Sequence, residues 1–435
     1  MSMLRHGLPA VVALSLAACG PQPIDPHKQI GPNPYLPEIH QYLLPPISVP
    51  KIEPWGLAVP TVAAGLQIKA LATNLANPRS LCVLPNGDIL VAESDGPPPP
   101  VYRPKEIVMG LIMGRAHGAT KAGNRVLLIR DPGHGAPPQI SVFIGHLNSP
   151  FGMALVGNDF YVAHTDAVLR FPYQTGDTQI TARPQKLTEL PGGPINHHWT
   201  KSLAVSPEGT KLYVGIGSNS NITENGLIAE QDRAMIWEID RKTGAHRQYA
   251  TGLRNPNGLT FEPTTHVLWA VVNERDELGP DLVPDYMTSV KEGAFYGWPY
   301  SYYGQHVDPR VKPARPDLVA KAIPPDYSLS SHVAPLGLAF YTGNALPVAY
   351  RGGAFVAEHG SWDRSPLNGY RIVFIPFANG RPNGMARDVV TGFLAPDGGV
   401  RGRPVTLAVD ARGGLLIADD VGNTVWRLSA AAAAP

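Results

Sequence analysis

Polar side chains that could do chemistry stand before several strand-like runs in this chain, and the fullest set lies in residues 252–259. Arg254 and Asn255 occupy a turn punctuated by Pro256 and Gly258, directly before an alternating apolar run. Loops on rigid strands commonly carry catalytic and binding residues. Because an arginine fork matches carboxylate or phosphate oxygens, Arg254 indicates an anionic ligand. We therefore expect this loop to carry chemistry.

Other arginines stand at equivalent places in similar stretches. If these stretches surround a common axis, four arginines meet in one cavity: Arg79, Arg254, Arg401 and Arg403. Like charges buried together are unfavourable unless an anion compensates them. The pattern therefore predicts a polyanionic cofactor or substrate. The alternative is that each arginine pairs with a nearby carboxylate such as Glu93, Glu274 or Asp419.

Histidine and acidic residues add two further possibilities. His198, within residues 196–201, could act as a general base near neutral pH, although a single histidine can equally be structural. The acidic residues 273–277, followed by Asp281 and Asp285, offer oxygen ligands that suit a hard cation such as calcium. Their spacing does not match an EF-hand loop, and the alternative is an acidic loop that is simply solvated.

A repeated unit would position all of these residues. A polar loop, an alternating strand, a tight turn and a second alternating strand recur six times, starting near residues 77, 148, 197, 252, 332 and 401. The entry and exit of an antiparallel hairpin lie at the same end of the sheet, so the polar residues gather at one edge. Six units predict an all-β fold, a six-bladed β-propeller of four-stranded antiparallel sheets. An array of β-sandwiches, or two smaller β domains, is the alternative.

The first residues have the character of a targeting segment. Arg5 and His6 precede a short apolar stretch that ends in Leu16-Ala17-Ala18-Cys19, so residues 1–18 are predicted to be a signal peptide. Cysteine after Leu-Ala-Ala resembles a bacterial lipobox, which makes Cys19 the expected site of lipidation. An ordinary signal peptide cut nearby is the alternative. With Gly20 after the cysteine, the pattern predicts a periplasmic lipoprotein anchored to the outer membrane.

Residues 19–60 are rich in proline and lack apolar periodicity, which predicts an extended tether between the anchor and the domain. Trp55 and the run Tyr42-Leu43-Leu44 would be costly to expose, so we expect parts of the tether to pack on the domain. Residues 61–435 are then the propeller domain.

Four motifs together resemble a known family. Residues 252–259 are similar to the Arg-Asn-Pro-Gln-Gly-Leu loop of the quinoprotein sugar dehydrogenases that use pyrroloquinoline quinone (PQQ), the glucose/sorbosone dehydrogenase family. Residues 196–203 resemble the loop with the catalytic histidine, and Arg401-Gly402-Arg403 resembles the paired arginines that hold the cofactor. Residues 295–299 are similar to a Tyr-Gly-Trp-Pro signature. The resemblance covers residues 66–428.

The resemblance implies a six-bladed propeller that binds PQQ, a cofactor with three carboxylates, together with calcium. His198 would take the proton from the substrate hydroxyl, while Arg254 and calcium would polarise the quinone oxygens. Asn255 would bind the cofactor, and Arg401 and Arg403 would clamp its acid groups. Residues 273–302 and 358–364 look most like the L-sorbosone dehydrogenase branch.

The sequence departs from the family at three points. The segment that binds calcium through backbone carbonyls in soluble glucose dehydrogenases is replaced here, so the expected metal site, through backbone or side chain, is Glu274, Arg275 and Asp276. The lysine that cradles the cofactor has no clear match, and Arg364 or His359 would substitute for it. His332 stands where a threonine is expected and is counted with the cofactor-binding residues.

The predicted function is oxidation of an aldose or sugar aldehyde, such as sorbosone, by hydride transfer to PQQ. Electrons would pass to a respiratory acceptor, a cytochrome or a quinone. The net charge of +1 gives no indication of a nucleic-acid partner, and membrane contact is expected through the lipid anchor only. A metal-dependent propeller hydrolase of the lactonase type and a non-catalytic propeller that binds an anionic ligand are the alternatives.

Overall fold

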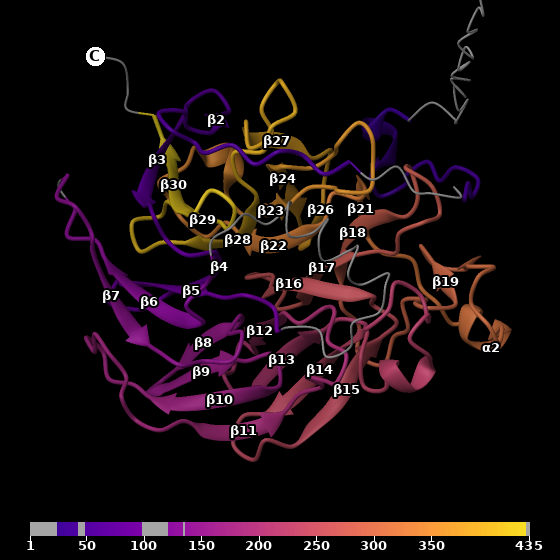
Figure 1. The fold of residues 1–435 in the computed structure, drawn as a ribbon, viewed down its shortest axis with the longest axis horizontal. Coiled ribbons are helices and arrows are strands. Elements are labelled where there is room, and N and C mark those ends of the chain that lie inside the picture. The colour runs from indigo at the N-terminus through magenta and orange to yellow at the C-terminus, as the bar shows by residue number, and fades with distance from the viewer. Residues whose placement is uncertain (1–23, 42–47, 98–120, 134, 432–435) are drawn as a thin grey trace, which may run out of the picture.

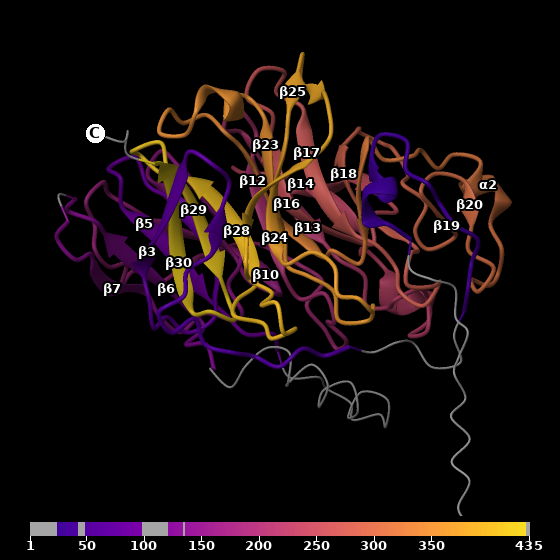
Figure 2. The same ribbon diagram turned by 90° about the horizontal axis from the view of Figure 1, so that it is seen from above.

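The computed structural model describes residues 24–41, 48–97, 121–133 and 135–431. Six antiparallel sheets surround a common axis and form the blades of a β-propeller (Figure 1). The innermost strands of neighbouring blades contact one another around the ring. In Figure 1 the strands of each blade follow one another outward from the axis, and Figure 2 shows the same ring turned by 90° about the horizontal axis. The predicted fold class is confirmed.

The first three blades each use four consecutive strands. Blade 1 contains β4 (Pro78–Val83), β5 (Ile89–Glu93), β6 (Arg125–Arg130) and β7 (Gln139–Ile144). Blade 2 contains β8 (Met153–Val156), β9 (Asp159–Ala163), β10 (Ala167–Pro172) and β11 (Gln185–Glu189). Blade 3 contains β12 (Lys201–Val205), β13 (Lys211–Ile216), β14 (Met235–Asp240) and β15 (His246–Thr251).

The last three blades recruit strands from the N-terminal part of the chain. Blade 4 contains β16 (Asn255–Phe261), β17 (Leu268–Asn273), β18 (Pro284–Ser289), β21 (Tyr327–Ser331) and, outermost, β1 (Ile30–Gly31). Blade 5 contains β22 (Pro335–Phe340), β23 (Ala354–Glu358), β24 (Arg371–Ile375), β27 (Arg387–Thr391) and β2 (Thr61–Val62). Blade 6 contains β28 (Pro404–Val409), β29 (Leu415–Asp419), β30 (Thr424–Ala430) and β3 (Leu66–Ala72).

Small elements decorate this ring. They are the hairpins β19 (Ser301–Tyr302) with β20 (His306–Val307) and β25 (Phe377–Ala378) with β26 (Arg381–Pro382), the short helix α2 (Pro316–Val319), and the 3-10 turns η1 (Pro26–Gln29), η2 (Leu227–Glu230) and η3 (Val348–Tyr350). In the described part of the chain, no helix has the length and apolar character needed to cross a membrane.

The core is divided into clusters between neighbouring blades. In β5, Leu90 and Ala92 pack with side chains of blade 2, whereas Ile89 and Val91 face blade 6. Successive side chains of a strand point to opposite faces, so a strand between two blades must be apolar on both. This explains the nearly continuous apolar runs of the inner strands, which hold the rigid ends where the polar loops begin.

The described residues of the expected tether lie against the propeller. Trp55 is 9% exposed, and its indole donates a hydrogen bond of 2.8 Å to Asp419 Oδ2. Its ring packs edge-on against Phe393 and Trp426. This confirms that burial of Trp55 draws the segment onto the domain. Cys19 and Tyr42-Leu43-Leu44 lie outside the described residues.

Candidate functional site

The entry and exit of the inner hairpins meet at one edge of the ring, which we call the rim. The pairings Asn255↔Asn273, Pro335↔Glu358 and Pro404↔Asp419 bring the two ends of each hairpin side by side. The loops that carry the predicted site residues extend from these ends, as the hairpin argument predicts.

Arg254 is held at the rim by several acceptors. Its Nη1 donates to the Glu274 carbonyl at 2.6 Å, and its Nε donates to the Asn221 carbonyl at 3.1 Å. Its Nη2 lies 3.0 Å from Asn221 Oδ1 and 3.2 Å from Asp276 Oδ2. The side chain is buried, so these contacts fix the direction of the guanidinium. Among the described residues, Asp276 is the one carboxylate that contacts this guanidinium.

His198 precedes β12 and is oriented by Ser218, which follows β13 in the same blade. Its Nδ1 lies 2.7 Å from the Ser218 carbonyl. A carbonyl only accepts hydrogen bonds, so Nδ1 carries the proton and Nε2 keeps its lone pair. Burial, and next the charge of Arg254, lower the pKa of His198 well below 6.5. The imidazole is therefore neutral at physiological pH and competent as a base.

Glycine lets His198 and Asn255 approach each other. A Cβ at Gly217 would lie 2.4 Å from Asn255 Oδ1 and 2.5 Å from the Cβ of His198, closer than side chains tolerate. Asn255 is buried, and its Oδ1 has no hydrogen-bond partner among the described residues. Since an unsatisfied buried acceptor is costly, this oxygen indicates a ligand that donates to it.

A cluster of two aspartates and one histidine lies beside Arg254. His332 Nδ1 is 3.5 Å from Asp276 Oδ1 and 3.4 Å from Asp363 Oδ2, and its Nε2 donates to the Gly279 carbonyl at 3.1 Å. One ligand atom from each of Asp276, His332 and Asp363 lies within 4.8 Å of the others. These three donors converge from blade 4, from the link to blade 5, and from blade 5 itself.

Electrostatics in this cluster keep a proton on the imidazole. Burial disfavours the charged form of His332, but the carboxylates of Asp363 and Asp276 outweigh burial and raise its pKa to about 10. Burial also raises the pKa of Asp276, yet Arg254 and His332 bring it down to about 2. For Asp363, burial prevails over the attraction of His332 and raises the pKa to about 6.

Of the three residues expected to hold a metal, Asp276 alone belongs to this cluster. The side chain of Arg275 is fully buried and donates to the Glu274 carboxylate at 3.0 Å and to the Ser301 carbonyl at 2.6 Å. It also lies 3.2 Å from Asp308. Arg275 therefore anchors the loop around β19 and β20. The Glu274 carboxylate faces Arg275, and its carbonyl faces Arg254.

The arginine pair lies further around the rim, before β28 of blade 6. Arg403 donates to the carbonyls of His359 at 3.0 Å and Gly360 at 2.6 Å, and its guanidinium lies 5.1 Å from the Tyr370 ring centre. Arg401 is half-buried, and within the described residues its guanidinium makes no ion pair or hydrogen bond. Neither guanidinium is neutralised by a carboxylate, so both suit an anion.

Two other candidates have carboxylate partners. Arg79 contacts Asp420 Oδ2 at 2.5 Å, as the pairing alternative predicts, and the same oxygen lies 2.9 Å from His359 Nε2. Arg364 is buried and contacts Asp281 at 2.8 Å, while its other bonds reach carbonyls of Ser331 and the N-terminal segment. The structure therefore does not bring Arg364 into the set around Arg254.

Sequence reasoning missed Asn221 and the ligating position of Asp363. Asn221 Oδ1 accepts from Arg254 and from the Asp276 amide at 2.8 Å, and its Nδ2 donates to the Asp276 carbonyl at 3.1 Å. It lies in the insertion between β13 and β14, where no repeat spacing marks it. Asp363 stands in residues 358–364, which sequence reasoning used for the family resemblance alone.

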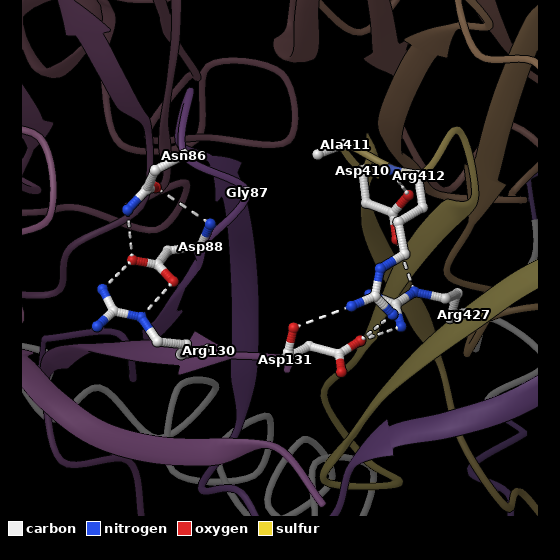
Figure 3. A pocket seen from close by; sticks show the side chains of 9 residues that line it. All are labelled: Asn86, Gly87, Asp88, Arg130, Asp131, Asp410, Ala411, Arg412 and Arg427. Atoms are coloured by element: carbon white, nitrogen blue, oxygen red, sulfur yellow. Dashed lines mark hydrogen bonds and ion pairs between the residues drawn. The ribbon is translucent and has the colours of Figure 1, made fainter. Parts of the chain in front are cut away.

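The edge opposite the rim contains a polar cavity of about 280 Å³ between blades 1 and 6 (Figure 3). Its arginines and aspartates pair with one another: Arg130 with Asp88, and both Arg412 and Arg427 with Asp131. Charges matched in this way leave no net attraction for an anion. This cavity lies at the turns between β4 and β5 and between β28 and β29, at the other end of the inner hairpins from the loops that carry the predicted site residues.

Comparison with protein families finds two matching family models. The "Glucose / Sorbosone dehydrogenase" family matches residues 158–361, which contain His198, Arg254 and His332. The "TrAA12-like" family matches residues 316–431, which contain the arginine pair.

Two relatives are similar in sequence. An uncharacterized protein of Borreliella burgdorferi is 30% identical over 292 residues, which cover 65% of this chain and 76% of that protein. The aldose sugar dehydrogenase YliI of Escherichia coli is 28% identical over 177 residues, 37% of this chain and 44% of the enzyme.

Solved structures share the fold along most of the chain. The calcium structure of an AA12-family protein of Trichoderma reesei has a TM-score of 0.68 and 20% identity, and covers 86% of this chain and 97% of its own. The holo PQQ domain of the Coprinopsis cinerea pyranose dehydrogenase has a TM-score of 0.68 at 19% identity, covering 85% and 97%. Together with the family model, these neighbours support placing the chain in the glucose/sorbosone dehydrogenase family.

Proposed function

We propose that this protein is a quinoprotein dehydrogenase that oxidises an aldose or a sugar aldehyde, such as sorbosone, with PQQ as the electron acceptor. The observation that carries the proposal is the neutral His198, fixed on the Ser218 carbonyl beside Arg254 and Asn255. A base of this kind suits removal of a hydroxyl proton as hydride leaves the same carbon.

The residues present fit a cofactor with several carboxylates. Arg401 and Arg403 offer guanidinium groups without carboxylate partners among the described residues, and Asn255 Oδ1 lacks a donor. When bound, PQQ supplies a quinone that accepts a hydride. Arg401 and Arg403 would hold its acid groups, and Asn255 would fix its orientation.

The chemistry left to the protein is proton transfer and charge stabilisation. His198 Nε2 would accept the substrate proton, because Nδ1 is already committed to Ser218. The Arg254 guanidinium, held by Asn221 and Glu274, would stabilise negative charge that develops during the transfer. Both side chains are already oriented, so little reorganisation is needed.

We further propose that Asp276, His332 and Asp363 bind a divalent cation next to Arg254. Two carboxylates suit calcium, the cation expected from the sequence, or manganese, whereas imidazole nitrogen suits zinc better. The cation would face His332 Nδ1, the nitrogen that lies near both carboxylates. Cation binding therefore requires release of the proton on Nδ1. A titration of metal-free protein with calcium, manganese and zinc tests this site and identifies the preferred cation.

The location and the electron partner rest on the sequence. We propose a periplasmic protein anchored to the outer membrane through a lipid on Cys19, which transfers electrons to a cytochrome or a quinone. Mass spectrometry of protein from a bacterial membrane fraction tests the lipid, and reduction of candidate acceptors by substrate-loaded enzyme tests the partner.

Stoichiometric titration of the purified chain with PQQ, followed by absorbance, tests the proposed function directly. The expected result is one cofactor per chain, and dye reduction when sugars or sugar aldehydes are added. A chain that binds no PQQ would contradict the proposal. The titration and a panel of aldoses and aldehydes together identify the substrate class.

The Asp276, His332 and Asp363 set also favours a second candidate, a metal-dependent hydrolase of the lactonase type. Such an enzyme needs the cation but not the arginine pair. Lactone hydrolysis that persists in the Arg401→Ala/Arg403→Ala variant would support the hydrolase. Anion binding without any turnover would instead indicate a non-catalytic propeller.

A further inference from the structure

The N-terminal segment of the described chain, residues 24–41 and 48–60, is bonded to the last three blades; we call it the strap. The strap contains β1, which pairs with β21 of blade 4, and it is followed by β2 and β3, which pair with β27 of blade 5 and β30 of blade 6. Figure 1 shows this segment, in indigo to violet, running across those blades before it enters β3. These blades carry the arginine pair, Arg401 and Arg403. They also carry the set of Asp276, His332 and Asp363, which we call the cation cluster.

The strap bonds to all three loops that carry the cation cluster. The His40 amide donates to the Leu278 carbonyl at 3.0 Å, two residues after Asp276. The Ser48 amide donates to the Trp362 carbonyl at 2.9 Å, one residue before Asp363.

Gln29 makes the third of these connections. It is fully buried, and its Nε2 donates to the Asp281 carbonyl at 2.5 Å. Its Oε1 accepts from the Ser331 hydroxyl at 3.0 Å, one residue before His332. One side chain from the strap therefore joins the loop of Asp276 to the loop of His332.

The strap also reaches the arginine pair. Val400 pairs with the strap on both sides, since its amide donates to the Lys51 carbonyl at 2.7 Å and its carbonyl accepts from the Glu53 amide at 2.8 Å. Val400 directly precedes Arg401. Trp55 donates to Asp419, and the other oxygen of that carboxylate accepts the Arg403 amide at 2.8 Å.

Each proposed ligand therefore has a residue bonded to the strap within three positions of it in the sequence. Arg403 is reached a second time, through the side chain of Asp419. Loops are the mobile parts of a fold, and a binding site must be held to within about 0.5 Å by its supporting residues. A flexible tether would need none of the buried bonds of Gln29 and Trp55.

We infer that the strap is a positioning element of the site, which fixes the loops that carry Asp276, His332, Asp363, Arg401 and Arg403. The inference rests on the proposed function for its consequence, a loss of cofactor and cation affinity. The bonds themselves, and their effect on loop motion, stand independently of that function.

Backbone hydrogen exchange in the full-length chain tests the inference through Gln29→Ala and Trp55→Phe. Gln29→Ala should speed exchange about tenfold or more in residues 278–281 and 330–332, because local opening becomes easier when a buried bond is lost. Trp55→Phe keeps an aromatic ring but removes the indole N–H, and it should affect the Arg403 and Gly422 amides, which both donate to Asp419. Leu57→Ala is the matched control, since Leu57 lies on the strap fully exposed. Unchanged exchange at these loops would overturn the inference.

PQQ and cation titrations of the same variants give the second measurement. Each variant should bind about tenfold more weakly than the Leu57→Ala control, while exchange in blades 2 and 3 stays unchanged. Faster exchange with unchanged affinity would overturn the positioning role and leave the strap a stabilising element only. If the wild-type chain binds neither PQQ nor cation, the proposed function fails, and the exchange measurement alone decides whether the strap fixes these loops.

Discussion

The rim and the opposite edge of the propeller use the same residue types in different ways. At the opposite edge, arginines and aspartates pair with each other across the seam between blades 1 and 6 (Figure 3), and Arg412 is 50% exposed in its ion pair with Asp131. At the rim, Arg254 and Arg403 are buried and bond largely to backbone carbonyls. The arginines of the opposite edge pair with carboxylates, whereas among the described residues Arg403 has no carboxylate partner and Arg254 has Asp276 alone.

This difference shows which charges serve stability and which serve a ligand. A half-exposed ion pair contributes about 0–1 kcal/mol, because water already solvates both partners. A buried guanidinium with carbonyl partners remains a net positive charge in a region of low dielectric constant, where an anion is attracted strongly. The rim is therefore the edge at which we expect binding, although the opposite edge also contains a polar cavity.

The largest effect should come from His198 at the rim. His198→Ala removes the proposed base, so the rate of sugar oxidation with PQQ should fall by about 10²–10⁴-fold. His197→Ala is the control, since His197 is exposed and adjacent. Equal losses in the two variants, measured by dye reduction, would show that the loop as a whole is needed rather than the imidazole of His198.

Loss of the arginine pair at the rim should weaken PQQ binding, whereas loss of arginines at the opposite edge should not. Arg401→Ala/Arg403→Ala removes two charged partners of the cofactor and should weaken PQQ binding by about 100-fold or more, as each charged hydrogen bond contributes about 1.5–3 kcal/mol. Arg412→Ala/Arg427→Ala at the opposite edge should leave PQQ affinity within about twofold. If the two double variants lose PQQ affinity to a similar extent in an absorbance titration, the rim is not distinguished from the opposite edge as the binding site.

The free energy of unfolding should depend on pH through the cation cluster, which distinguishes this cluster from the ion pairs of the opposite edge. His332 has a folded pKa of about 10, above its ordinary value of 6.5, so its stabilising charge is fully present below pH 6.5 and is lost as pH rises to 10. The unfolding free energy of the metal-free protein should therefore fall across this window, and His332→Asn should flatten the change.

The affinity of the cluster for a cation should instead rise with pH, because the metal competes with the proton. Calorimetric titrations at pH 7 and 9 measure this second trend.

The smallest effect should be found at the opposite edge. Arg412→Ala breaks a half-exposed pair with Asp131, which Arg427 also contacts. The free energy of unfolding should change by about 0–1 kcal/mol, measured by denaturant titration. A loss of several kcal/mol would mean that the seam between the first and last blades depends on these charges.

The sequence predicts the ring and the rim because both follow from local patterns. Alternating apolar residues and tight turns define the inner hairpins, and the hairpin geometry places His198, Arg254 and Arg403 at one edge. Trp55 was also predictable, since an exposed indole is costly. These features need no knowledge of how distant parts of the chain meet.

The cation cluster and the supporting contacts were not predictable in this way. Asp363 and Asn221 come from insertions whose paths the repeat does not specify, and their partners lie far away in sequence. Arg275 resembles a site residue by its position, yet it is buried under the loop of β19 and β20. Only the tertiary fold distinguishes an arginine that supports a loop from one that faces a ligand.

The pairing of β3 with β30 has a consequence for how the protein is made. Leu66 leaves the ribosome long before Ala430, its partner in the sheet of blade 6. The early strand must wait without its neighbour while the other blades fold in turn. Because Arg403 belongs to the blade that this pairing completes, assembly of the cofactor site coincides with closure of the ring. A chain cut short before β30 would lack the strand that joins β3 to β29, and the blade beside Arg403 would stay incomplete.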